Sequence, residues 1–187
     1  MSSNTKSSYS EARRILFTDL DNHKSKVCCV YTGKCTTTSS IPDSKEMNCE
    51  HSWPQSRGAR GIAKADLHHL FPAISLINSI RGNFPFCIVE KIEWQGMGSK
   101  LGYNKNGEKC FEPPISHRGN LARALFYFSV RYEKQILENE ENTLLKWNKE
   151  DSVDREEQAR DDLIEHYQHN RNLFVDYPQL IDLIGNF

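Results

Sequence analysis

The sequence has no long apolar run. Among its 187 residues, no stretch approaches the roughly 18 consecutive apolar residues that a membrane-spanning helix requires. The mean hydropathy of -0.67 and the 26% of charged residues are equally unlike those of a membrane protein. Low-complexity disorder is excluded as well, because 3 Trp, 7 Tyr and 9 Phe are spread along the chain. With no internal repeat and no long linker, we expect one domain over residues 1–187.

The sequence also lacks the cysteine spacing of a structural zinc site. No C-x-x-C pair faces a second such pair or an H-x-x-x-H motif. An even number of cysteines in an oxidising compartment permits about 15 disulfide pairings, and buried free thiols are the alternative. The cysteines are Cys28, Cys29, Cys35, Cys49, Cys87 and Cys110.

The N-terminal residues Met1–Lys6 contain no apolar stretch, so we expect no signal peptide there. If the natural protein is exported, the signal is therefore missing from this sequence.

The formal net charge of -1 conceals an uneven distribution. Residues 51–123 carry ten Lys and Arg against five Asp and Glu, whereas residues 124–187 carry seven against fourteen. A basic segment favours a polyanionic partner such as nucleic acid. An acidic helical face that is merely solvated is the alternative reading of the acidic third.

The periodicity of apolar residues predicts an α+β fold with a mainly helical body. Helices are expected over residues 9–21, from Pro72 to near Arg81, from Ser116 past Ile136, around residues 144–147, over 153–169 and over 178–184. Strands are expected over 27–32, 47–53, 63–67 and 86–94. Loops are expected over 36–44 and from the end of the last strand through Cys110. Ser8 with Glu11 is a plausible capping box, and Asp176 a candidate cap for the last helix.

Reactive side chains are densest between Glu50 and Asn83. A phosphodiester hydrolase needs a base that deprotonates water, a hard cation, and positive charge near the phosphate. A neutral histidine can serve as the base, and carboxylate and amide oxygens suit Mg²⁺. Arginine supplies the bidentate phosphate contact.

Glu50 and His51 are adjacent on a predicted strand, which creates a structural demand. Neighbouring side chains on an extended strand point to opposite faces. Both residues can therefore serve one site only if a bulge or a strand end redirects one of them.

Several segments resemble one known family in the right order along nearly the whole chain. They are EHSWPQS at 50–56, DLHHLFPA at 66–73, NSIRGN at 78–83, FEPPISHRGNLARALFYF at 111–128, WNKEDSVDREEQAR at 147–160 and NRNLFVDYP at 170–178. Together they resemble the endonuclease I family of His-Me finger (ββα-metal) nucleases. The resemblance implies a ββα-metal motif at about residues 47–83 within the helical body.

The same resemblance implies a mechanism. His51 would be the general base, and Glu50 and Asn78 would bind a single Mg²⁺, for which Mn²⁺ can substitute. The substrate would be DNA, and RNA as well, cut endonucleolytically with little sequence preference to leave 5′-phosphates. The arginine that stabilises the transition state would be Arg57 or Arg60, which lie between His51 and Asp66, unless Arg81 reaches the phosphate instead.

Other polar residues receive supporting roles. Asp66, His68 and Asn83 are expected around the site, although a turn aspartate bonded to local N–H groups is the competing reading of Asp66. Of His68 and His69, at most one is expected to approach the site, and Trp53 and Phe71 are expected in the core. The candidates for contacts to backbone phosphates are Arg60, Lys64, Arg118 and Arg123, the last two with internal salt bridges as the alternative.

Two alternatives to a nuclease remain open at this point. One is a non-catalytic nucleic-acid-binding protein on the same scaffold, and the other is a small disulfide-rich protein with incidental histidines. By family analogy we expect a secreted or periplasmic protein with no membrane contact, and we assume a monomer. Six cysteines suit that oxidising location.

Overall fold

The computed structural model describes residues 8–187, so the segment Met1–Lys6 lies outside the described residues. The helices are α1 (Tyr9–Ile15), α2 (Ser75–Arg81), α3 (Arg118–Tyr132), α4 (Glu138–Glu150), α5 (Arg155–Gln168) and α6 (Leu173–Asp176). A π-helical turn, η1 (Leu16–Leu20), continues α1. The 3-10 helices are η2 (Gln55–Arg57), η3 (Gly61–Ala65), η4 (Leu67–His69), η5 (Ile115–His117) and η6 (Pro178–Leu183).

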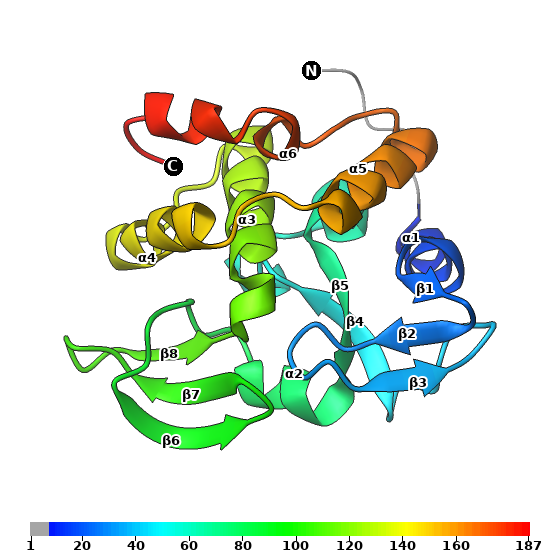
Figure 1. Cartoon of the computed structure of the whole chain (residues 1–187), viewed down its shortest axis with the longest axis horizontal. Coiled ribbons are helices and arrows are strands. Elements are labelled where there is room, and N and C mark those ends of the chain that lie inside the picture. The colour runs from blue at the N-terminus through cyan, green and yellow to red at the C-terminus, as the bar shows by residue number, and fades with distance from the viewer. Residues whose placement is uncertain (1–7) are drawn as a thin grey trace.

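The strands form three separate antiparallel sheets. They are β1 (Asn22–His23), β2 (Lys26–Cys28) and β3 (Cys35–Thr37); β4 (Met47–His51) and β5 (Leu70–Ile74); and β6 (Lys91–Gly96), β7 (Ser99–Tyr103) and β8 (Lys109–Glu112). Figure 1 shows the two three-stranded sheets on opposite sides of the molecule, with β4, β5 and α2 between them. Helices α4, α5 and α6 surround α3 at the other end. This mixture of helices and strands is compatible with the expected α+β class.

The first and the longest helices form where the apolar pattern predicts them. Ser8 caps α1 by accepting a hydrogen bond from the Glu11 backbone N–H at 3.2 Å, as a capping residue should. In α3, the apolar stripe that includes Leu121, Leu125 and Phe128 is buried. The predicted helix was too long, however, because α3 ends at Tyr132 and the chain leaves it through Glu133 in the left-handed region (φ 51°).

The expected strand over 63–67 and the expected helix start at Pro72 are wrong. Residues 61–69 form the 3-10 turns η3 and η4, and Pro72 lies in the middle of β5, opposite Cys49. Proline is tolerated there because the sheet has only two strands, so no second partner needs its missing N–H. The Pro72 carbonyl instead accepts a hydrogen bond from the Val30 N–H at 3.0 Å.

The expected strand over 86–94 and the loop after it are also corrected. Strand β6 starts only at Lys91, and the supposed loop contains β7 and β8. Phe86 makes an isolated parallel bridge to Phe111 instead. Gly102 makes the sheet possible, because a Cβ at this position would lie 2.1 Å from the Lys91 carbonyl oxygen.

Smaller boundaries differ as well. The strand predicted over 27–32 is the short β2, and β3 extends into the loop expected over 36–44. Pro178 begins η6 as expected, but Asp176 does not cap it and instead accepts hydrogen bonds from Arg171. The core that these elements enclose includes Trp53 and Phe71, as predicted. Within residues 8–187, no helix combines the length and apolarity needed to cross a bilayer.

The cysteines divide between the two uses that the sequence left open. Cys28 is bonded to Cys35 and Cys87 to Cys110, whereas Cys29 and Cys49 are free and buried. The first disulfide joins β2 to β3, and the second ties the segment before β6 to β8.

Thiol titration checks this assignment. Without reductant, unfolding in guanidinium should expose two reactive thiols, and reduction should raise the count to all six cysteines. The native protein should react slowly, because both free thiols are buried. Six reactive thiols in the unreduced, unfolded protein would contradict both disulfides.

Candidate active site

Strands β4 and β5 and helix α2 follow one another in space as a strand–strand–helix unit. The register pairs Met47 with Ile74 and His51 with Leu70 without any shift, so β4 contains no bulge. Helix α2 begins directly after β5, at Ser75. A pocket of about 270 Å³ opens beside this unit. It is lined by Cys49, Glu50, His51, Pro54, Gln55, Ser56, Asn78, Arg81, Gly82 and Asn83.

Glu50 and His51 can both face one pocket because β4 ends at His51. His51 is the last residue of β4, and the chain bends away immediately after it. Both residues border the same pocket, together with Asn78 and Arg81 from α2. The four predicted site residues are therefore brought together.

Glu50 is a buried carboxylate with defined partners. Its Oε1 accepts a hydrogen bond from the Tyr31 hydroxyl at 2.8 Å and lies 3.1 Å from Arg81 Nε. Burial raises the pKa of Glu50, and the Arg81 guanidinium and the Tyr31 hydrogen bond oppose that rise. The carboxylate is thus oriented by two groups that both favour its ionised form.

Arg81 is itself buried, and each of its side-chain nitrogens lies close to an oxygen. Its Nη1 donates to the Gly82 carbonyl at 2.7 Å and its Nη2 to the Ser52 carbonyl at 2.9 Å. The guanidinium also lies 4.5 Å from the centre of the Phe86 ring. These contacts hold Arg81 against Glu50 at the base of the pocket.

Asn78 is oriented by a residue that the sequence analysis missed. Its Nδ2 donates to Asn48 Oδ1 at 2.6 Å, across from α2 to β4. This bond fixes the amide so that its Oδ1, a suitable ligand for a hard cation, is directed away from Asn48. The two-residue spacing of Asn48 and Glu50 was a usable signal, because residues i and i+2 of a strand share a face. Tyr31 gave no such signal, since it lies far away in the sequence.

His51 is held by the backbone and by aromatic neighbours. Its Nε2 lies 3.1 Å from the Lys64 carbonyl oxygen. Its ring centre lies 5.3 Å from that of Tyr9 and 5.5 Å from that of His69. With the proton on Nε2, that nitrogen donates to the Lys64 carbonyl and Nδ1 keeps its lone pair.

The electrostatics around His51 favour the neutral ring. Burial lowers the pKa of His51 to about 3, with nearby His69 acting in the same direction and the Lys64 carbonyl opposing it. His69 is neutral for the same reason, because burial lowers its pKa to about 4. A neutral imidazole is the form that can accept a proton from water.

The donor set fits a small hard cation held by few protein ligands. Glu50 offers carboxylate oxygens and Asn78 an amide oxygen, and both border an open pocket. Among residues 8–187, no group of three or more His, Cys, Asp or Glu forms a closed metal cage. Mg²⁺ is commonly bound by one or two carboxylates while it keeps several waters, so this set suits it.

The other predicted arginines and the lysine lie outside the pocket. Arg57 Nη1 pairs with the buried Glu140 at 2.8 Å, and its guanidinium lies 5.2 Å from the Trp53 ring centre. Arg60 is exposed at the start of η3. The Lys64 ammonium lies 4.5 Å from the centre of the Tyr9 ring, next to His51.

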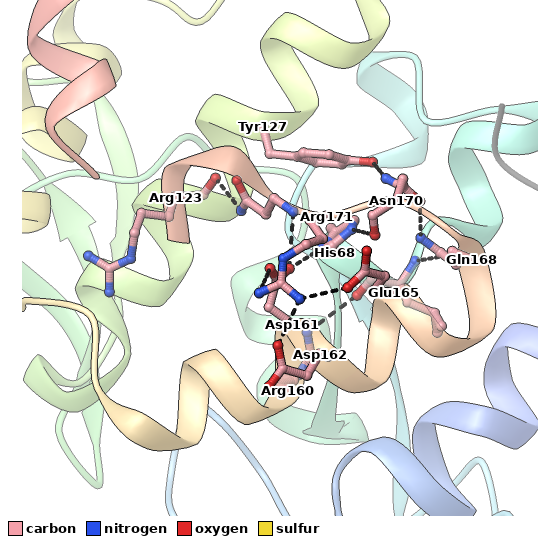
Figure 2. Close-up of polar contacts among 12 residues, drawn as sticks. His68, Arg123, Tyr127, Arg160, Asp161, Asp162, Glu165, Gln168, Asn170 and Arg171 are labelled. Atoms are coloured by element: carbon pink, nitrogen blue, oxygen red, sulfur yellow. Dashed lines mark hydrogen bonds and ion pairs between the residues drawn. The ribbon is translucent and has the colours of Figure 1, made fainter. Parts of the chain in front are cut away.

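Asp66 and His68 belong to a separate buried network, which corrects their expected place around the site. Figure 2 shows the part of this network around His68. Asp66 accepts hydrogen bonds from the His68 backbone N–H and the Gln168 side chain, and from the hydroxyls of Tyr127 and Tyr132. The bond to the His68 N–H is the local turn contact that was the competing reading.

His68 turns towards α5 in the same network. Its Nε2 lies 3.3 Å from the Asn170 carbonyl and its Nδ1 lies 3.4 Å from Asp161. The histidine that approaches the site is therefore His69. Asn83, in contrast, borders the pocket as predicted and donates to Ser56 Oγ at 3.2 Å.

Arg118 and Arg123 form internal salt bridges, so their expected role at a phosphate surface is corrected. Arg123 is fully buried, and its Nη2 lies 2.6 Å from Glu157 Oε2 on α5. Arg118 pairs with the buried Glu112 on β8. Both arginines neutralise buried carboxylates, which is the alternative that the sequence left open.

Comparison with known proteins gives one consistent result. The model of the family described as Endonuclease I matches residues 2–179. An "Extracellular ribonuclease" of Bacillus amyloliquefaciens is 37% identical over 98% of this chain and 70% of its own length. An "Extracellular ribonuclease" of Bacillus subtilis (strain 168) is 36% identical over 74% of this chain and 54% of its own length. An "Extracellular deoxyribonuclease" of Aeromonas hydrophila is 30% identical over 60% of this chain and 49% of its own length.

The structural role of Arg123 is testable by equilibrium unfolding. Arg123→Ala leaves Glu157 buried without its partner, so the free energy of unfolding should fall by about 3–5 kcal/mol in a urea titration. Arg60→Ala is the control, and its exposed position predicts a change of about 0.5 kcal/mol or less. An Arg123→Ala protein of unchanged stability but weaker nucleic-acid binding would support the surface role instead.

Proposed function

The chain belongs to the Endonuclease I family, and from this premise we propose that it is a Mg²⁺-dependent, sequence-nonspecific endonuclease. The observation that carries the proposal is the convergence of Glu50, His51, Asn78 and Arg81 on one pocket. In this proposal, β4, β5 and α2 are the ββα unit of a His-Me finger.

In the proposed reaction, His51 is the general base. Its Nε2–H donates to the Lys64 carbonyl, which leaves Nδ1 to take a proton from the attacking water. The low pKa of His51 keeps the ring neutral near pH 7, so the base needs no prior deprotonation. Tilted and edge-on ring contacts with Tyr9 and His69 limit rotation of the ring, which preserves this orientation.

Glu50 and Asn78 are the proposed metal ligands. When bound there, Mg²⁺ supplies a positive charge that stabilises the phosphate under attack and the leaving 3′ oxygen. Mn²⁺, which accepts the same oxygen donors, is expected to substitute. Tyr31 and Arg81 orient the Glu50 carboxylate, and Asn48 orients the Asn78 amide.

We assign the phosphate contact to Arg60. Arg57 is paired with Glu140, and every nitrogen of Arg81 faces Glu50 or a backbone carbonyl. Arg60 lies on the same segment between His51 and Asp66 and is exposed. Arg81 then acts as a positioning residue for Glu50, while Lys64 remains a proposed contact to backbone phosphates.

The proposed substrates are DNA and RNA, cut to leave 5′-phosphates. Relatives named for ribonuclease and for deoxyribonuclease activity both resemble this chain, which supports a site that reads the phosphodiester backbone. Because the chain spans 70% and 54% of the two Bacillus relatives, activity of the whole protein is part of the proposal. Two disulfides and the extracellular or periplasmic relatives support export from the cytoplasm.

The rival function is a nucleic-acid-binding protein without turnover. A plasmid-nicking assay with Mg²⁺ and with EDTA separates the two. Cleavage that requires Mg²⁺ supports the nuclease, and binding without nicking supports the rival.

The role of His51 predicts a specific kinetic defect. His51→Ala should lower the rate of plasmid cleavage by about 10²–10⁴-fold, because the water loses its base, while DNA affinity stays close to that of the parent. His166→Ala removes an exposed histidine of α5 and should cleave at the parent rate. Parent-like cleavage by His51→Ala would rule out this base.

The role of Glu50 predicts a defect in metal binding. Glu50→Gln retains the side-chain shape and an acceptor for Tyr31 but removes the charge. Calorimetric titration with Mg²⁺ should give an affinity at least about tenfold weaker, and half-maximal cleavage should need correspondingly more Mg²⁺. Glu112→Gln is the matched control, since Glu112 is another buried carboxylate paired with an arginine. An unchanged Mg²⁺ titration for Glu50→Gln would exclude it as a ligand.

A further inference from the structure

An aromatic and basic cluster lies next to the catalytic pocket and takes no part in the mechanism above. It consists of Phe84, Lys91, Tyr103 and Lys109. Lys109 Nζ lies 5.4 Å from the Phe84 ring centre and 5.8 Å from that of Tyr103. Lys91 Nζ lies 5.8 Å from the Tyr103 ring centre. We call this group the Phe84–Tyr103 cluster.

The sheet register places three members of the cluster on one face. Tyr103 on β7 pairs directly with Lys91 on β6 and with Lys109 on β8. Directly opposed residues in an antiparallel sheet point to the same side. Tyr103 is thus flanked by a lysine on each neighbouring strand.

Phe84 joins this face because its segment is fastened to β8. Pro85 accepts a hydrogen bond from the Phe111 N–H at 2.9 Å, and the Cys87 N–H donates to the Phe111 carbonyl at 3.1 Å. The Cys87–Cys110 disulfide adds a covalent link between the same two segments. The position of Phe84 beside Lys109 is therefore built into the fold.

The cluster directly continues the catalytic pocket. Gly82 and Asn83 border the pocket, and Phe84 is the next residue. Gly82 ends α2 with φ 60° and ψ -129°, a conformation that other residues rarely adopt, and this turn leads the chain from the pocket to the cluster. A substrate strand that leaves the pocket past Asn83 would meet Phe84 first.

Partly exposed aromatic rings beside lysines are the recognised elements of a single-strand binding surface. Bases stack on aromatic faces without regard to sequence, and lysines attract the backbone phosphates. Phe84 and Tyr103 are both partly exposed, as is Lys109, while Lys91 is exposed. Double-stranded nucleic acid cannot offer base faces in this way, because its bases are already stacked on one another.

From this geometry we infer that the Phe84–Tyr103 cluster binds unpaired nucleotides flanking the scissile phosphate by stacking, so that the protein favours single-stranded or locally opened nucleic acid. The inference rests on the proposed nuclease function for its link to cleavage. It would make Phe84 and Tyr103 specificity-determining residues for that reaction.

Glu93 reduces the positive charge of the cluster. Its carboxylate lies 2.5 Å from Lys109 Nζ and accepts a hydrogen bond from the Tyr103 hydroxyl. It therefore neutralises part of the positive charge that a phosphate would meet. Removing this charge should strengthen binding, which is the opposite of the effect of removing a ring.

The test measures the affinity of a fluorescently labelled single-stranded oligodeoxynucleotide by anisotropy in EDTA, where metal-dependent cleavage does not occur. Phe84→Leu and Tyr103→Leu keep apolar bulk but remove the stacking face, and each should bind about tenfold more weakly. Phe84→Tyr should restore binding. Glu93→Gln should bind about threefold more tightly at low salt.

The matched control is Tyr177→Leu, which removes an exposed tyrosine from the end of α6, far from β6–β8 (Figure 1). It should bind as the parent does. For a duplex of the same sequence, the parent and Phe84→Leu should have similar affinities. Parent-like affinity of both leucine variants for the single strand would overturn the inference, as would equal losses on single strand and duplex.

A second readout separates this inference from the proposed function. With Mg²⁺, the cluster variants should lose kcat/KM on the oligonucleotide but not on bis(p-nitrophenyl) phosphate, which is too small to reach the cluster. If the parent hydrolyses neither substrate, the proposed function fails, while the anisotropy result still decides whether the cluster binds single strands. If the parent hydrolyses both and the variants match it on both, the cluster proposal fails and the function stands.

Discussion

The buried negative charge of Glu50 is the constraint on which the rest of the site depends. A carboxylate removed from water is costly unless it is paired and hydrogen-bonded. Here the two partners come from distant parts of the chain, Tyr31 from the segment after β2 and Arg81 from the end of α2. Stabilising one charge therefore fixes the position of α2 against β4, and Asn78 is carried into the pocket on the same helix.

Many of the basic residues in the middle of the chain are not available at the protein surface. Several positive charges of residues 51–123 form ion pairs inside the fold. Arg118 and Arg123, for example, neutralise buried carboxylates. The network around Asp66 likewise joins η4 to α3 and α5 rather than serving the pocket. A count of charges along the chain therefore overestimates the positive surface available to a polyanion. Basic groups that remain for a polyanion include the exposed Arg60, Lys64 next to Tyr9, and the lysines of the Phe84–Tyr103 cluster.

The surroundings of the proposed base differ from those of the two proposed metal ligands. His51 lies against rings and backbone carbonyls, an environment that favours the uncharged imidazole. Glu50 and Asn78 lie beside hydrogen-bond partners that fix their oxygens. One side of the pocket therefore suits proton transfer and the other suits a hard cation, although the residues at 50 and 51 are neighbours in the chain.

The sequence by itself determined some of the local elements and the family. Capping at Ser8 and the apolar stripe of α3 are short-range features, and the ordered motifs around Glu50 and His51 sufficed to identify the family. It could not determine β7 and β8, because these short strands, SKLGY and KCFE, lack a clear alternating pattern and are held by cross-strand partners. Only the tertiary structure decided which arginines are internal, that His69 rather than His68 approaches His51, and that Tyr31 and Asn48 hydrogen-bond to Glu50 and Asn78. Those outcomes depend on contacts between residues far apart in the chain, and apart from the two-residue spacing of Asn48 and Glu50, local spacing contains no information about such contacts.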